Sequence, residues 1–161
     1  MKYTGTDKFD HAQPPRLGVL VTNLGTPQAP ERKPLRIYLK EFLSDPRVVE
    51  VPRLLWWFIL NGIILNVRPA RSAAAYRTVW TDQGSPLLLN TQAQAEALQA
   101  ALGERHGDTV IVVFAMRYGT PALADVVQDM LERGVRRMLG IPRYPRYSGT
   151  TPGSTFVALG A

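Results

Sequence analysis

Three loops of this sequence combine residue types that could bind a ligand, and each follows an apolar run. The loops are residues 23–27 (NLGTP), 117–121 (RYGTP) and 143–151 (RYPRYSGTT). An arginine guanidinium can bind a carboxylate through two parallel hydrogen bonds, and tyrosine or leucine side chains can cover an apolar plane. Turns rich in glycine and hydroxyl groups can instead hold a phosphate through backbone amides. The residue types therefore predict either a large, flat, apolar carboxylic acid or a phosphorylated ligand.

Several other kinds of chemistry find no support in the sequence. It contains no Gly-x-Gly-x-x-Gly sequence, no phosphate-binding lysine loop and no Gly-x-Ser-x-Gly elbow. The absence of cysteine excludes disulfides, thiolate catalysis and an iron–sulfur cluster within this chain. The two histidines, His11 and His106, stand alone in polar segments, so neither is expected to bind a metal or to activate Ser85 or Ser148. We predict no catalytic residue, no metal ligand and no bound cofactor in this chain.

Length and composition place the chain among ordinary globular domains. It has 161 residues, of which 45% are hydrophobic and 20% are charged, enough for one domain with its own core. The 19 basic and 13 acidic residues give a net charge of +6, but the basic residues are scattered, so no nucleic-acid surface is predicted. The first residues are polar and contain no apolar secretory signal, which makes the cytoplasm the expected location.

Apolar periodicity predicts the elements that position these loops. Continuous β-branched runs predict strands at residues 17–24, 109–116 and 135–141. Helices are expected at residues 35–43, 54–67, 70–79, 90–103 and 121–133. Asn90 or Thr91 is the expected cap of the fourth helix, and the last helix is expected to begin at Pro121, after Thr120.

The alternation of strands and helices predicts the fold class and the place of the site. Parallel strands need helical crossovers, so we expect an α/β fold with an open, mainly parallel sheet and helices on both faces. The domain is expected at residues 16–161, after a polar leader at residues 1–15. Ligands of such sheets bind at the carboxyl ends of the strands, where the three loops would meet.

One segment, residues 54–67 (LLWWFILNGIILNV), is almost entirely apolar and lies between arginines. It is interrupted by Asn61 and Gly62 and is shorter than the roughly twenty residues that span a bilayer. It could be a buried helix, or an exposed lip that receives a flat apolar ligand or rests on a membrane surface. Adjacent tryptophans face different sides of a helix, which favours the lip. The expected lip residues are Leu54, Trp56, Trp57, Ile59, Leu60, Ile63 and Ile64.

Six separated blocks resemble, in this order, the ferrochelatases of proteobacteria. They are residues 23–27, 38–49, 52–65, 84–87, 115–119 and 144–148, within a resemblance that covers about residues 16–156. The resemblance implies a lyase that inserts ferrous iron into protoporphyrin IX, the last step of protohaem synthesis. It also implies two similar Rossmann-like α/β domains with the porphyrin cleft between them. This chain corresponds to the first half of the longer family, and the histidine and glutamate that handle metal and protons belong to the other half.

The resemblance also implies roles for individual residues. It places Leu24 against the macrocycle, and Arg117 with Tyr118 in the cleft near the metal path. The full set of expected porphyrin-binding residues is Leu24, Arg68, Tyr76, Ser85, Arg117, Tyr118 and Tyr147. The implied partners are protoporphyrin IX, ferrous iron as substrate and a carboxyl-terminal domain. The apolar segment matches the lip of the family and implies a peripheral contact with the inner membrane.

The end of the chain departs from the family pattern. Arg143 stands where the family is apolar, which would place a charge in a buried or cleft-lining position, and Arg146, Pro152 and Val157 replace a glutamine, a threonine and an aspartate. We therefore expect a truncated or decaying reading frame or a sequence error, and an isolated chain without activity. Two other functions stay open: a non-catalytic phosphate- or nucleotide-binding module, and a membrane-surface interaction domain.

Overall fold

The computed structural model describes residues 14–144 and 146–160. Three strands form one parallel sheet in the order β2–β1–β3, with β1 at Arg16–Thr26, β2 at Val110–Gly119 and β3 at Val135–Pro142. β1 and β3 contain their predicted runs, and β2 contains its run except for Thr109; each strand extends beyond its run by one to three residues at an end. The α/β class and the open parallel sheet are confirmed. Because all three strands run the same way, their carboxyl ends meet at one edge of the domain.

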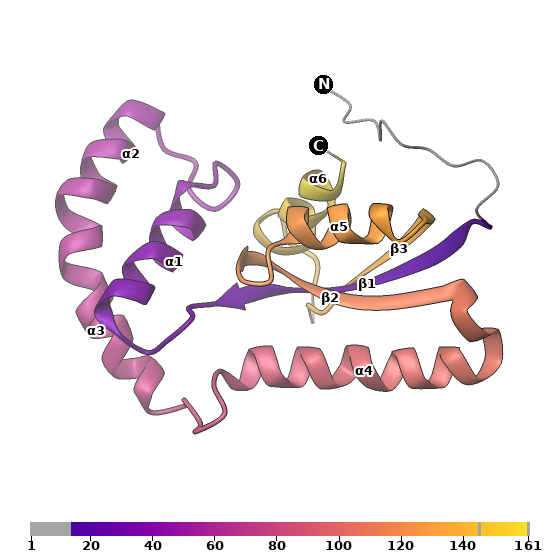
Figure 1. Ribbon diagram of the computed structural model, residues 1–161. Coiled ribbons are helices and arrows are strands. Elements are labelled where there is room, and N and C mark those ends of the chain that lie inside the picture. The colour runs from indigo at the N-terminus through magenta and orange to yellow at the C-terminus, as the bar shows by residue number, and fades with distance from the viewer. Residues whose placement is uncertain (1–13, 145, 161) are drawn as a thin grey trace.

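Helices cover both faces of the sheet (Figure 1). On one face lies α4 (Pro86–His106), followed by a single 3-10 turn, η2 (Gly107–Thr109). On the other lie α5 (Leu123–Glu132) and α6 (Ser154–Leu159), the latter preceded by a π-helical turn, η3 (Gly149–Gly153). Successive side chains of β1 point to opposite faces of the sheet and so contribute to both cores. Val19 and Val21 pack with Ala95 of α4, whereas Leu20 packs with Leu123 and Met130 of α5.

A helical arm, defined here as residues 32–77, lies beyond the carboxyl ends of the strands (Figure 1). It consists of α1 (Arg32–Ser44), α2 (Arg53–Ile59), the π-helical turn η1 (Leu60–Ile64) and α3 (Leu65–Arg77). The stripe predicted for the first helix buries Leu39 and Leu43 against Leu60 and Leu65 of the following turns. The arm therefore has its own small core, separate from the two cores of the sheet.

The arm is continuous from residue 53 to residue 77, so the predicted break into two helices is wrong. At Asn61 and Gly62 the chain widens into the π-helical turn instead of ending, and the Asn61 amide donates to the Trp57 carbonyl at 2.9 Å. Pro69 lies inside α3 and has no N–H for the Leu65 carbonyl, four residues earlier. The Arg36 guanidinium of α1 donates to that carbonyl at 2.9 Å, which compensates for the missing bond and ties α1 to α3.

Two helices begin at residues other than those predicted. Helix α4 begins at Pro86 rather than Asn90, because a proline fits the first helical position and Ser85 precedes it as the cap residue. Thr91 is therefore inside the helix, where its hydroxyl donates to the Leu87 carbonyl at 2.7 Å. Helix α5 begins at Leu123, because the Pro121 carbonyl is engaged by the backbone N–H of Met116 at 2.8 Å.

The departures near the end of the chain are accommodated in different ways. Arg143 is exposed, and its backbone N–H donates to the Thr22 carbonyl at 2.7 Å. Of the two positions expected for this charge, buried or cleft-lining, the buried one is therefore wrong. Pro152 is buried within η3, ahead of the start of α6, and Arg146 and Val157 are exposed.

Candidate functional site

The two Gly-Thr-Pro turns lie side by side at the ends of β1 and β2. Gly25 pairs with Tyr118 and Thr26 with Gly119, and both glycines adopt positive φ angles of 112° and 86°. A side chain at Gly25 would collide with the Tyr118 carbonyl oxygen, so glycine is required for the close approach of the two strand ends. The two turns are not identical, because the Thr120–Pro121 peptide bond is cis whereas the Thr26–Pro27 bond is trans.

Helix α1 is attached to these turns by polar side chains. The Tyr38 hydroxyl donates to the Gly25 carbonyl at 3.2 Å, and the Glu41 carboxylate accepts the backbone N–H of Gly119 at 2.9 Å. Each turn therefore offers one backbone group to α1. The spacing of three residues places Tyr38 and Glu41 on the same face of the helix.

Asp45, the residue that follows the end of α1, is the centre of a buried polar cluster. Its Oδ2 accepts from Arg117 Nη2 at 2.6 Å, from the Tyr118 hydroxyl at 2.8 Å and from the Ser154 hydroxyl at 2.9 Å. Its Oδ1 accepts the backbone N–H of Arg47 at 2.8 Å. Arg117 Nε donates to Ser154 at 2.8 Å, and the guanidinium lies 4.6 Å from the Tyr118 ring centre. One carboxylate thus joins α1, β2 and α6.

The cluster holds Asp45 in its charged form. Burial raises the pKa of the Asp45 carboxyl, but the Arg47 N–H, the Tyr118 and Ser154 hydroxyls and the Arg117 guanidinium together outweigh burial, so the pKa is lowered. Burial is also the main reason that the pKa of Tyr118 is raised to about 12. The expected state is therefore a carboxylate that accepts from a neutral phenol and a guanidinium.

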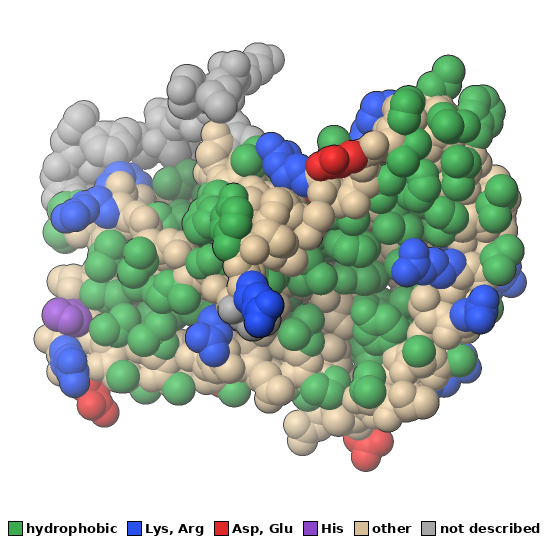
Figure 2. All heavy atoms as spheres, turned by 180° about the vertical axis from the view of Figure 1, so that it is seen from behind, with side chains coloured by type: hydrophobic (Ala, Val, Ile, Leu, Met, Phe, Trp, Pro, Cys, Tyr) green, Lys and Arg blue, Asp and Glu red, His purple; other side chains and the backbone are tan. Residues whose placement is uncertain are grey.

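Two other arginines have a different environment. Arg68 and Arg71 line a hollow of about 460 Å³ along η1 and α3, together with Ile63, Val67 and Ser72. In the part of the chain that the structure describes, neither guanidinium makes a hydrogen bond or an ion pair. Figure 2 shows the arm at the right, where basic side chains lie among apolar ones beside a concave surface. Both charges are available to an acidic ligand.

Tyr76 connects this hollow to the strand ends. Arg68, Ser72 and Tyr76 are four residues apart on α3 and therefore share one face. Tyr76 is half-buried, and its ring lies 6.2 Å from that of Trp80. Burial raises the pKa of Tyr76, with a smaller opposing effect of the neighbouring Tyr38 hydroxyl, which itself reaches Gly25.

The remaining expected porphyrin-binding residues are placed in three different environments. Leu24, at the end of β1, is half-buried. Ser85 is buried and accepts from the Thr26 hydroxyl at 2.9 Å. Tyr118 is 1% exposed, whereas Tyr147 is 75% exposed. The structure thus brings Arg117, Tyr118 and Asp45 together. Tyr76 neighbours Tyr38, whose hydroxyl bonds the Gly25 carbonyl, and Tyr147 makes no such contact among the described residues.

The expected lip residues divide between the surface and the core of the arm. Leu54, Trp57 and Ile63 are exposed, Trp57 to 58%, and Leu55, Phe58 and Val67 extend the exposed apolar surface beyond the residues expected for it. Leu60 is 3% exposed and belongs to the core of the arm, so it is not a surface residue. Ile59 and Ile64 are half-buried. Trp56 is also half-buried, and its indole N–H donates to the Leu43 carbonyl at 2.7 Å.

Sequence reasoning missed the residues that hold the predicted ones. Asp45, Ser154 and Arg71 are not among the site residues expected from the sequence. Tyr38 and Glu41 share one face of α1, and Asp45 directly follows the end of that helix. Their partners, however, are far along the chain; Arg117 is 72 residues beyond Asp45.

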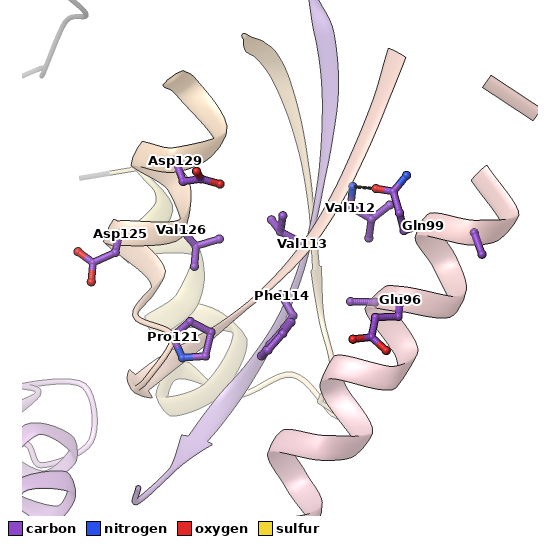
Figure 3. A pocket seen from close by; sticks show the side chains of 11 residues that line it. Glu96, Gln99, Val112, Val113, Phe114, Pro121, Asp125, Val126 and Asp129 are labelled. Atoms are coloured by element: carbon purple, nitrogen blue, oxygen red, sulfur yellow. Dashed lines mark hydrogen bonds between the residues drawn. The ribbon is translucent and has the colours of Figure 1, made fainter. Parts of the chain in front are cut away.

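Another hollow lies away from this site (Figure 3). It measures about 690 Å³ and lies between α4 and α5 over β2, which is an edge strand. Val113, Phe114 and Val126 line it, with Glu96 and Asp129 on its two walls. Gln99 covers part of the strand edge by accepting the Val112 N–H at 2.6 Å. None of the expected porphyrin-binding residues lines this hollow, so it is not the site that the loops form.

The described residues contain no group of three or more His, Cys, Asp or Glu side chains that could hold a metal ion. His106 is exposed at the end of α4, and His11 lies outside the described residues. No helix among residues 14–144 and 146–160 is long and apolar enough to cross a membrane.

Comparison with known proteins identifies the family. The family model described as Ferrochelatase matches residues 16–161. A curated ferrochelatase of Idiomarina loihiensis is 63% identical over 159 residues, which cover 99% of this chain and 44% of the relative. That of Pseudoalteromonas atlantica is 60% identical over 160 residues, with the same two shares. The chain thus spans less than half the length of these relatives. On this evidence the chain belongs to the ferrochelatase family.

Proposed function

We propose that this chain is the amino-terminal, porphyrin-binding half of an enzyme that inserts ferrous iron into protoporphyrin IX to give protohaem. Iron and porphyrin are substrates of the complete enzyme. The observation that carries the proposal is the pair of unpaired arginines, Arg68 and Arg71, above an apolar hollow on the arm. Such a surface suits a flat apolar molecule with carboxylates at one edge.

The arrangement of the arm supports this ligand over a phosphorylated one. Ile63 and Val67 supply apolar walls beside the two guanidinium groups, as a macrocycle with propionates requires. Backbone amides of the third loop were expected to hold a phosphate, but the N–H groups of Thr151 and Gly153 donate to the Ser148 carbonyl at 3.3 and 3.1 Å. These two amides are therefore already partnered within the chain.

The test of binding is a fluorescence titration of the chain with protoporphyrin IX. One wall of a cleft covers only one face of the macrocycle, so we expect a Kd no tighter than micromolar, about −8 kcal/mol. The substitution Arg68→Ala removes a charge-assisted contact from a partly wet site and should weaken binding about tenfold, whereas Arg105→Ala on α4 should not. ATP and inorganic phosphate should not compete. Tight phosphate binding without porphyrin binding would favour the phosphate-binding module instead.

We also propose that residues 1–161 alone do not insert metal. The histidine and glutamate that the family resemblance assigns to metal and proton handling lie outside this sequence, and half a cleft cannot enclose a macrocycle. Zinc or iron insertion by the purified chain, followed by the change in porphyrin absorbance, should not exceed the uncatalysed rate. Insertion above that rate would contradict the proposal.

The exposed apolar surface of the arm supports a further part of the proposed function, a peripheral contact with the inner membrane. Leu54, Trp57 and Ile63 are available to enter the headgroup region, and basic side chains lie beside them. Co-sedimentation with anionic phospholipid vesicles measures this contact. The substitution Trp57→Glu should reduce it, whereas Ile37→Glu, on an exposed position of α1, should reduce it less. Equal losses would argue against the lip as the contact.

A further inference from the structure

We propose that Asp45 is a positioning residue of the ligand site, which acts through Arg117 to hold the helical arm against the strand ends. The proposal rests on the proposed function, because the arm carries Arg68. Asp45 is 8% exposed, and the three donors on its Oδ2 come from β2 and α6. Among the polar residues that attach α1 to the sheet, which are Tyr38, Glu41 and Asp45, Asp45 is thus the one that is both buried and paired with a charged partner.

The other two hydrogen bonds between α1 and the strand ends, those of Tyr38 and Glu41, are weaker. Tyr38 makes a neutral hydrogen bond of 3.2 Å with Gly25, and the bond from Gly119 to Glu41 is exposed. Charge-assisted bonds in a buried site are stronger than either kind. Asp45 is therefore the strongest polar link between the end of α1 and β2, beside the edge-to-face contact of Phe42 with Tyr118, whose ring centres lie 5.1 Å apart.

A shift of α1 would be transmitted to the ligand-binding part of the arm. Leu39 and Leu43 of α1 pack against Leu60 and Leu65, and Arg36 donates to the Leu65 carbonyl at 2.9 Å. Arg68 lies one turn beyond Leu65 on the same helix. The arm therefore moves with α1, and Arg68 moves with the arm.

Arg117 itself is poorly placed to bind a ligand carboxylate. Its Nη2 is used by Asp45 at 2.6 Å and its Nε by Ser154 at 2.8 Å. A ligand that took over this guanidinium would leave the buried Asp45 charge without its counterion, which is unfavourable. The geometry favours Arg117 as the link between Asp45 and β2. If Arg117 acts in this way, removing Asp45, Arg117 or both should weaken ligand binding to the same extent, which direct binding by Arg117 would not predict.

The experiment is a double-mutant cycle on the Kd of protoporphyrin IX, with Asp45→Asn, Arg117→Gln and the double variant of the full chain. Each single substitution should raise the Kd about tenfold, and the double variant should also bind about tenfold more weakly instead of a hundredfold. Circular dichroism establishes that each variant is folded at the titration temperature. The matched control is the exposed pair Asp129→Asn and Arg133→Gln, whose side chains lie 3.2 Å apart on α5 and should change the Kd less than about twofold.

The outcomes separate this proposal from the proposed function. A double variant that binds about a hundredfold more weakly, or an unchanged Kd in Asp45→Asn, would overturn the positioning role of Asp45. Porphyrin binding would still be established. Absence of porphyrin binding by the unsubstituted chain would overturn the proposed function, and the positioning role with it. If Asp45→Asn does not fold, Ser154→Ala removes one donor and keeps the ion pair. It should weaken binding about threefold in the unsubstituted background and not at all beside Arg117→Gln.

Discussion

Arg117 and Arg68 were expected to meet the same ligand, yet the structure gives them opposite environments. Arg117 is held by Asp45 and Ser154 in a largely buried cluster at the end of β2. Arg68 lines an apolar hollow on α3, and among the described residues its guanidinium has no partner. On the proposed function, the charge of Arg117 therefore serves the structure of the chain itself, and that of Arg68 is left for the ligand.

This difference shows that residue type alone does not identify a binding group. A guanidinium whose donors are satisfied by a buried carboxylate gains little from a second carboxylate, because the first would lose its counterion. An unpaired guanidinium beside apolar walls loses only water on binding. The two arginines therefore differ because Arg117 is paired with the carboxylate of Asp45, whereas Arg68 lies beside no carboxylate among the described residues.

The largest expected effect is the loss of stability on removing that carboxylate. Asp45→Ala leaves the Arg117 charge and the Tyr118 and Ser154 hydroxyls without their acceptor, which should lower the free energy of unfolding by about 3–5 kcal/mol. Urea denaturation measures this change. Asp129→Ala, at the exposed pair on α5, should cost no more than about 0.5 kcal/mol. Similar losses at the two positions would remove the distinction between buried and exposed charges on which the comparison rests.

A smaller loss is expected at the turn that places β1 beside Arg117 and Tyr118. Gly25→Ala combines a positive φ with a collision against the Tyr118 carbonyl and should cost about 2–4 kcal/mol. Gly84 also has a positive φ, of 125°, but a side chain there would meet open space, so Gly84→Ala should cost only about 1 kcal/mol. Urea denaturation of both variants separates the collision from the strain. Equal costs would show that the close approach of the strand ends is unimportant.

The pH dependence of unfolding provides a subtler test of the Asp45 cluster. The pKa of Asp45 is lower in the folded chain than its ordinary value, so its stabilisation is complete above the unfolded pKa of about 3.9 and is lost as the pH falls through the folded pKa. The unfolding free energy of the chain should therefore fall more steeply below about pH 4 than that of Asp45→Asn. Urea denaturation between neutral and acidic pH provides the comparison, and parallel curves would contradict a charged Asp45 in the folded state.

The sequence predicted the sheet well because its signals are local. The run from Leu17 to Leu24 is apolar and β-branched, and a parallel strand covered on both faces needs such a run. The π-helical turn at Asn61 and Gly62 was missed, since an interruption of this kind can end a helix or widen it. Here the side-chain amide of Asn61 donates to the Trp57 carbonyl, and that of Asn66 donates to the carbonyls of Asn61 and Gly62.

The candidate site was only partly predictable. Arg68 and Tyr76 lie on one face of α3, as their spacing allows, but the spacing cannot show that Arg68 is unpaired. Arg117 was assigned to a ligand because its actual partner, Asp45, is 72 residues away and belongs to a different element. Long-range pairing of charges decides which arginine is free, and a single sequence does not contain that information.

The measurement that tests the central claim most directly compares protoporphyrin IX with a form whose two propionates are esterified. If Arg68 and Arg71 bind the carboxylates, the unsubstituted chain should prefer the free acid about tenfold, Arg68→Gln should reduce that preference, and Arg68→Gln combined with Arg71→Gln should bind both forms equally. Arg117→Gln should weaken binding of both forms and keep most of the preference, because Arg68 and Arg71 are still present. A preference that survives in the double variant and disappears in Arg117→Gln would contradict the account, since it would make Arg117 the group that binds the acid.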